Sequence, residues 1–167
     1  VIRGIVESVI VADPANPAAI REVLESDGDV AAVILEPTGA SSGRVPLSAA
    51  FVSMLREITA VKGIVLIFDE VVTGFRVSKG GAQAYYSVTP DLTTLAKIVA
   101  GGMPGAAVVG LREILEALDF NATSISGKEK IQHQCTFNAY PVSSTAGYTA
   151  LSIIEASNDN RSSEADS

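Results

Sequence analysis

The chain has 167 residues, a formal net charge of −7 and a sequence pI near 4.6. This acidic balance disfavours nucleic acid and anionic membrane surfaces as partners, because both repel negative charge. The single cysteine, Cys135, excludes an internal disulfide and favours a reducing, cytoplasmic compartment. No apolar run approaches the roughly 20 residues that a membrane helix requires. We therefore expect one cytoplasmic domain with a sizeable core and no transmembrane segment.

The first half of the chain alternates predicted strands and predicted helices. Apolar runs predict buried strands at Ile5–Val11, Val30–Leu35 and Ile64–Phe68. Helical spacing of apolar residues predicts one helix between Pro17 and Gly28 and another between Ser48 and Gly63. Strands that alternate with helices in this order are typical of a parallel α/β sheet with right-handed crossovers.

The second half carries shorter elements and more polar connections. In chain order we expect a loop that includes one helical turn at 78–87, short strands at 92–96 and 106–109, a helix at 111–118, an exposed excursion at 121–130 and a helix that begins at Pro141. From Ser157 the composition changes to Asn, Asp, Arg and Ser. We therefore assign residues 1–156 to one domain and residues 157–167 to a frayed tail.

Two predicted strands end on residues that could carry chemistry. The run Ile64–Phe68 stops on Asp69 and Glu70, and ligands of open α/β sheets bind beyond the carboxyl ends of such strands. The alternative is that both carboxylates only solvate the strand end. Lys97 follows its strand in the same way, either as a solvated loop lysine or as a buried amine. Burial favours the neutral amine, which is the nucleophile that forms a Schiff base.

Several ordered motifs resemble those of one enzyme family. The matching segments are Phe68–Arg76, Gly80–Tyr85, Thr89–Lys97 and Gly101–Pro104. Their order and spacing are similar to those of the class III aminotransferases, which are pyridoxal-phosphate enzymes of fold type I, and above all to the glutamate-1-semialdehyde aminomutase-like branch. The resemblance implies a three-layer αβα fold with a mainly parallel sheet. It also implies that this chain is part of the family's large domain, without the N-terminal segment and the C-terminal small domain.

The resemblance implies a role for each of four residues. Asp69 matches the aspartate that pairs with the pyridine nitrogen of pyridoxal phosphate, and Val71 matches the residue that packs on a ring face. Lys97 matches the lysine that holds the cofactor as a Schiff base and then moves a proton as general acid and base. Thr136 matches a threonine that bonds the cofactor phosphate from the neighbouring subunit. The resemblance therefore implies a homodimer with a shared active site.

Two departures from other branches narrow the substrate. Ornithine- and GABA-type members carry Gln where this chain has Val72 and Glu where it has Ser41. Their absence favours the aminomutase-like branch over an ω-amino substrate. Cys135 and Tyr140 also differ from the usual Gly and Asn around Thr136, which makes the phosphate contact less secure than the Asp69–Lys97 pair.

The expected function is amino-group transfer on a small amino or keto substrate, by an aminotransferase or by an aminomutase, which is an isomerase. Two alternatives stay open. The chain could be a catalytically silent fragment that acts only in dimerisation. It could also belong to a pyridoxal-phosphate decarboxylase or racemase, which would use the same Asp69 and Lys97. No metal site is predicted, because His133 has no second His or Cys at ligand spacing.

Overall fold

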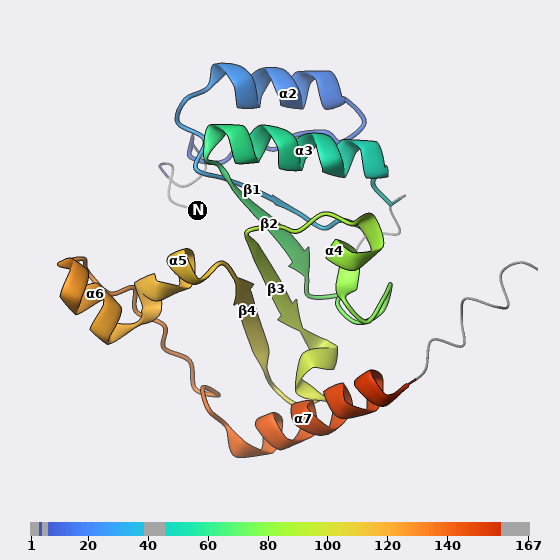
Figure 1. Cartoon of the computed structure of the whole chain (residues 1–167), viewed down its shortest axis with the longest axis vertical. Helices are drawn as coiled ribbons and strands as arrows, with labels where there is room; N and C mark the ends of the chain where they lie inside the picture. The colour runs from blue at the N-terminus through green and yellow to red at the C-terminus, as the bar shows by residue number, and fades with distance from the viewer. Residues whose placement is uncertain (1–3, 5–6, 39–45, 158–167) are drawn as a thin grey trace, which may run out of the picture.

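The computed structural model describes residue 4 and residues 7–38 and 46–157 of the chain (Figure 1). Its centre is a sheet in the order β1-β2-β3-β4. The strands are β1 (Ala32–Leu35), β2 (Val65–Glu70), β3 (Leu92–Ala96) and β4 (Ala106–Gly110). The first three strands pair in parallel, and β4 pairs antiparallel with β3. The predicted α/β class with a mainly parallel sheet is confirmed.

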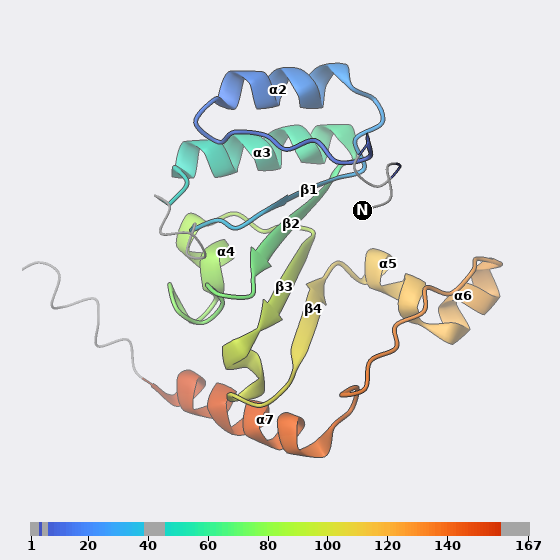
Figure 2. The same cartoon turned by 180° about the vertical axis from the view of Figure 1, so that it is seen from behind.

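Helices lie beside the sheet and across the carboxyl end of its third strand. They are α2 (Pro17–Ser26), α3 (Ala49–Lys62), α4 (Gly81–Tyr86), α5 (Arg112–Leu115), α6 (Phe120–Ser126) and α7 (Pro141–Ala156), with short 3₁₀ turns η2 (Lys97–Ala100) and η3 (Glu116–Leu118). Figures 1 and 2 show α2 alongside α3, and α7 across the carboxyl end of β3. No helix of the described residues is both long enough and apolar enough to cross a membrane.

Helix α3 begins and ends where its sequence predicts. The Ser48 hydroxyl accepts a hydrogen bond from the Phe51 backbone N–H at 3.2 Å and so caps the first turn. Gly63 ends the helix in the left-handed region with a φ of 69°, a conformation that glycine adopts without steric cost. The helix therefore delivers the chain into β2 at a defined residue.

The alternation of β2 sends its side chains to two different environments. Leu66, Phe68 and Glu70 are buried, whereas Val65, Ile67 and Asp69 are only partly buried. The buried set packs against α3 and α4. The core of the described residues consists of Leu24, Phe51, Val52, Leu55, Ile58, Ile64, Leu66, Phe68, Ala82, Tyr86 and Val88. Because alternate residues of a strand face opposite sides, neighbouring Asp69 and Glu70 meet different surroundings.

A partly buried ion pair fixes β3 beside β2. The Asp91 carboxylate accepts a hydrogen bond from the Leu66 backbone N–H at 2.7 Å, and its other oxygen lies 3.0 Å from the Arg56 guanidinium. Charge-assisted hydrogen bonds of this kind are shorter and stronger than neutral ones. They hold the register in which Asp69 is the Cα partner of Thr94.

Three sequence expectations differ from the structure. The predicted strand Ile5–Val11 is wrong for the described residues 7–11, where Ser8 bonds back to the Gly4 carbonyl and the next residues are exposed coil without a partner strand. The predicted excursion 121–130 contains helix α6, which Asp119 caps through the Ala122 N–H at 2.8 Å. Asp69 and Glu70 lie inside β2 rather than beyond its end. Residues 158–167 of the predicted tail lie outside the described residues.

Candidate active site

Asp69 and Lys97 lie at the carboxyl ends of two neighbouring parallel strands. Asp69 is the last residue but one of β2, and Lys97 directly follows β3. Because β2 and β3 run in parallel and pair Asp69 with Thr94, both residues belong to the same edge of the sheet (Figure 1). This is the edge at which ligands of open α/β sheets bind.

The two oxygens of the Asp69 carboxylate have different surroundings. Oδ1 accepts two hydrogen bonds at 3.1 Å each, one from the Val71 backbone N–H and one from the Thr94 hydroxyl. The described residues supply no hydrogen bond donor to Oδ2. Asp69 is also only partly buried, so Oδ2 can take a donor from outside the chain.

Lys97 occupies a strained backbone position. Its φ is 53°, in the left-handed region that residues other than glycine rarely adopt. Such a residue costs about 1–3 kcal/mol and persists where the surrounding structure imposes it, often at functional sites. Lys97 is exposed in this chain, which agrees with the alternative of a solvated loop lysine and not with that of a buried amine. The reason is that β3 ends at Ala96 and Lys97 already begins the turn η2.

Helix α7 packs closely against the turn that begins at Lys97. A Cβ added to Gly147 would lie 2.5 Å from the Val99 carbonyl oxygen, so only glycine permits this contact. The Ser143 hydroxyl donates to the Pro104 carbonyl at 2.6 Å on the far side of the turn. Sequence reasoning missed this support, although a glycine inside an apolar helix is a signal of close packing.

Glu70 has a structural task that the sequence left open. It is only 2% exposed, and its Oε2 accepts hydrogen bonds from the Ala82 N–H at 2.7 Å and from the Thr73 hydroxyl at 3.4 Å. The carboxylate therefore caps the N-terminus of α4, where a negative charge is favourable. Gly81 has a φ of 68°, and a Cβ there would lie 2.5 Å from Glu70 Oε2.

The other two predicted site residues lie outside this pair of strands. Val71 is one residue past β2, partly buried, and contacts Asp69 through its backbone N–H. Thr136 is exposed in the turn that precedes α7. The hydrogen bonds of the described residues do not connect Thr136 with Asp69 or Lys97. Their roles toward a cofactor remain predictions.

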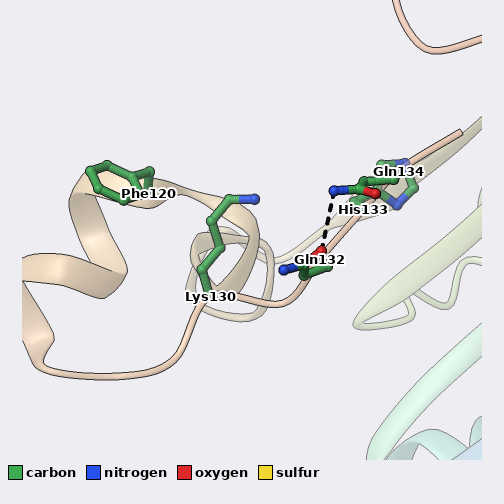
Figure 3. Close-up of a pocket in the computed structure, with 5 residues that line it drawn as sticks. All are labelled: Phe120, Lys130, Gln132, His133 and Gln134. Atoms are coloured by element: carbon green, nitrogen blue, oxygen red, sulfur yellow. Dashed lines mark hydrogen bonds between the residues drawn. The ribbon is translucent and has the colours of Figure 1, made fainter.

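A separate pocket lies on the segment that leads to Thr136. It encloses about 320 Å³ and is lined by Phe120, Lys130, Gln132, His133 and Gln134 (Figure 3). The Gln134 amide donates to Gln132 Oε1 at 3.2 Å within it. The lining includes neither carboxylates nor Lys97. Among the described residues, no three His, Cys, Asp or Glu side chains come together as metal ligands.

Comparisons with known proteins agree with this arrangement. The family model described as aminotransferase class-III matches residues 10–165. The glutamate-1-semialdehyde 2,1-aminomutase of Methanococcus vannielii is 45% identical over 137 residues, which are 81% of this chain and 30% of that protein. An omega-transaminase from Sphaerobacter thermophilus superimposes with a TM-score of 0.75 at 39% identity, over 87% of this chain and 32% of that one. A structure described as a transaminase with PLP bound gives a TM-score of 0.72 at 32% identity, over 84% and 32%.

The fold and the sheet edge thus define an α/β domain of the fold type I transferase class. The chain belongs to the class III aminotransferase family. It spans about a third of the length of the curated relatives that it matches.

Proposed function

We propose that this chain forms part of the cofactor site of a pyridoxal-phosphate enzyme that transfers amino groups. One observation carries the proposal: Asp69 and Lys97 lie at the same edge of the sheet. The Asp69 carboxylate has hydrogen-bond donors on only one of its oxygens among the described residues, and Lys97 is exposed and has a strained backbone. Family membership and the names of the relatives favour amino-group transfer over decarboxylation or racemisation.

The residues present fit the chemistry of this cofactor. When bound, its protonated ring withdraws electrons from the substrate Cα. Asp69 Oδ2, which lacks a donor from the described residues, would accept the hydrogen of the ring nitrogen. Val71 would pack on the ring. The Lys97 amine would hold the cofactor and, once a substrate amine replaced it there, would take and return the proton at Cα. Thr136 would donate to the phosphate of a neighbouring subunit in a homodimer.

The relatives and the sequence support one class of substrate. The curated relatives are aminomutases, and Val72 stands where ornithine- and GABA-type members carry Gln. We infer a small amino or keto substrate handled by the aminomutase-like branch. The single, exposed Cys135 is compatible with a cytoplasmic location, which belongs to the same proposal.

The decisive experiment is a titration with pyridoxal phosphate of the full reading frame that encodes this chain. Lysine-bound cofactor has a visible absorption band, which we expect in the unaltered protein and in a Lys128→Ala control, because Lys128 is an exposed loop lysine. The band should be absent from Lys97→Ala. A band that survives Lys97→Ala would refute the role of Lys97. Failure of the unaltered protein to bind the cofactor would support the alternative of a catalytically silent piece.

A further inference from the structure

Thr94 contacts the proposed cofactor carboxylate from the neighbouring strand. Its hydroxyl donates to Asp69 Oδ1 at 3.1 Å, and the two residues are Cα partners in the parallel pair β2–β3. Partners in a sheet share a face, so this contact follows from the register itself. Neither the motifs nor the comparisons assign a role to Thr94.

The two donors on Oδ1 hold the carboxylate in one orientation. The side-chain torsion that rotates a carboxylate is broad and nearly two-fold, so a partly exposed Asp at a strand end exchanges its oxygens readily. The Val71 N–H comes from the turn after β2, and the Thr94 hydroxyl comes from β3. Because both donors reach the same oxygen from different elements, rotation of the carboxylate about its side-chain torsion would break two hydrogen bonds at once. Oδ2 therefore keeps its lone pairs for an external donor.

We propose that Thr94 is a positioning residue that fixes the Asp69 carboxylate so that Oδ2 accepts the ring nitrogen hydrogen of the bound cofactor. The proposal rests on the proposed function of this edge. Among the described residues, the Thr94 hydroxyl makes its side-chain hydrogen bond to Asp69, and it would act on the cofactor through that carboxylate. A threonine suits this position because its β-branched side chain fits a strand while its hydroxyl supplies the donor.

The test compares three substitutions on β3 in the full reading frame. Thr94→Val keeps the shape of the side chain and removes the donor, whereas Thr94→Ser keeps the donor. Thr93→Val is the matched control, because Thr93 is 6% exposed on the opposite face of the same strand. Thr94→Ala removes the same donor and replaces Thr94→Val if that variant does not fold.

The first readout is the dissociation constant of pyridoxal phosphate and of its 1-deaza analogue, which has carbon in place of the ring nitrogen. We expect Thr94→Val to weaken pyridoxal phosphate about tenfold, which corresponds to about 1.4 kcal/mol. Thr94→Ser and Thr93→Val should stay near the unaltered protein. For the 1-deaza analogue, the dissociation constants of Thr94→Val and of the unaltered protein should be equal, because that ligand has no ring N–H to donate to Oδ2. Equal weakening of both ligands, or no weakening, would overturn the proposal.

The second readout needs no cofactor. The amide proton resonance of Val71 reports the hydrogen bond to Asp69 Oδ1, so it should move in Thr94→Val and stay in Thr94→Ser and Thr93→Val. An unmoved Val71 resonance would show that Thr94 does not hold the carboxylate. If the unaltered protein binds no pyridoxal phosphate, the proposed function fails and the role toward the ring nitrogen fails with it. The Val71 resonance then separates that failure from a failure of the Thr94–Asp69 contact.

Discussion

The Tyr86 hydroxyl joins two segments of the chain that are far apart in sequence. It lies 3.0 Å from the Pro37 carbonyl oxygen and 2.9 Å from the Leu47 carbonyl oxygen, at the two ends of the connection between β1 and α3. Tyr86 is 8% exposed and belongs to the core. Tyr86→Phe removes the hydroxyl and leaves the ring packing unchanged.

The expected loss of stability follows from the two carbonyl groups that remain when the hydroxyl is removed. The Pro37 carbonyl still accepts from the Leu47 N–H at 3.1 Å, so only the Leu47 carbonyl loses its donor. A net hydrogen bond contributes about 0.5–1.5 kcal/mol, and an acceptor left unpaired in a partly buried site adds to that loss. We expect Tyr86→Phe to lower the free energy of unfolding by about 1–2 kcal/mol. For a chain of this length, that is about 2–8 °C in Tm.

The assay is urea denaturation followed by circular dichroism, with Tyr85→Phe as the matched control. Tyr85 is 63% exposed, and its hydroxyl makes no hydrogen bond among the described residues, so its substitution should change stability by less than about 0.5 kcal/mol. Equal losses in the two variants would refute the reasoning, because the Tyr85 hydroxyl has no hydrogen bond among the described residues to lose.

A pH series adds an independent check on the same residue. Burial raises the pKa of the Tyr86 phenol above its usual value of 10.0, and neighbouring Tyr85 raises it further. The folded state therefore keeps its proton at a pH where the unfolded chain has lost it. The contribution of the hydroxyl is full below pH 10.0 and is lost as pH rises through the folded value. The stability difference between the unaltered chain and Tyr86→Phe should accordingly shrink above that pH.

Two further substitutions test the supports of the sheet edge. Glu70→Gln exchanges the buried carboxylate that caps α4 for an amide. We expect the free energy of unfolding, measured by urea denaturation, to fall by about 1–3 kcal/mol. An unchanged denaturation midpoint would contradict the role of Glu70 as a cap. Gly147→Ala places a methyl group against the Val99 carbonyl, so α7 must move away from η2. We expect Gly147→Ala to lower Tm and to shift the backbone resonances of Lys97. The control Ala156→Gly, at the end of α7, should leave those resonances in place. Unmoved Lys97 resonances in Gly147→Ala would contradict the contact between α7 and η2.

The elements that could be predicted are those whose signals are local. Strand β3 coincides with the predicted 92–96, because its short β-branched run is bounded by Pro90 and Lys97. Helix α3 is bounded directly by Ser48, which caps its first turn, and by Gly63, which ends it. The wrong strand Ile5–Val11 had the right composition, but a strand also needs a partner, and composition does not reveal one. Helix α6 escaped prediction because an Asp119 cap, rather than apolar periodicity, marks its beginning.

The features of the candidate site likewise divide into those with a local sequence signal and those without one. The places of Asp69 and Lys97 at strand ends could be predicted because each ends or follows an apolar run, whereas their roles toward a cofactor come from the family resemblance and stay predictions. The task of Glu70 could not be predicted, because the N–H that it caps lies 12 residues further along the chain. The orientation of Asp69 by Thr94 depends on the register of two strands that are separated by 25 residues. The packing of α7 on the turn after Lys97 brings together Val99 and Gly147, which are far apart in the sequence, so a glycine in the helix signals close packing but not its partner.

The alternation of β2 also determines where this chain can change in length. Deletion of one residue between Val65 and Phe68 would move Glu70 to the face of Asp69 and move Asp69 into the apolar core beside α3. Helix α4 would lose its cap, and the sheet edge would present a longer side chain in place of the oriented carboxylate. Residues 127–134 are exposed throughout, so gains and losses of residues there leave both strands in register and keep Thr136 beside α7. Variants of this domain should therefore differ in length between α6 and α7 and keep the length of β2 constant.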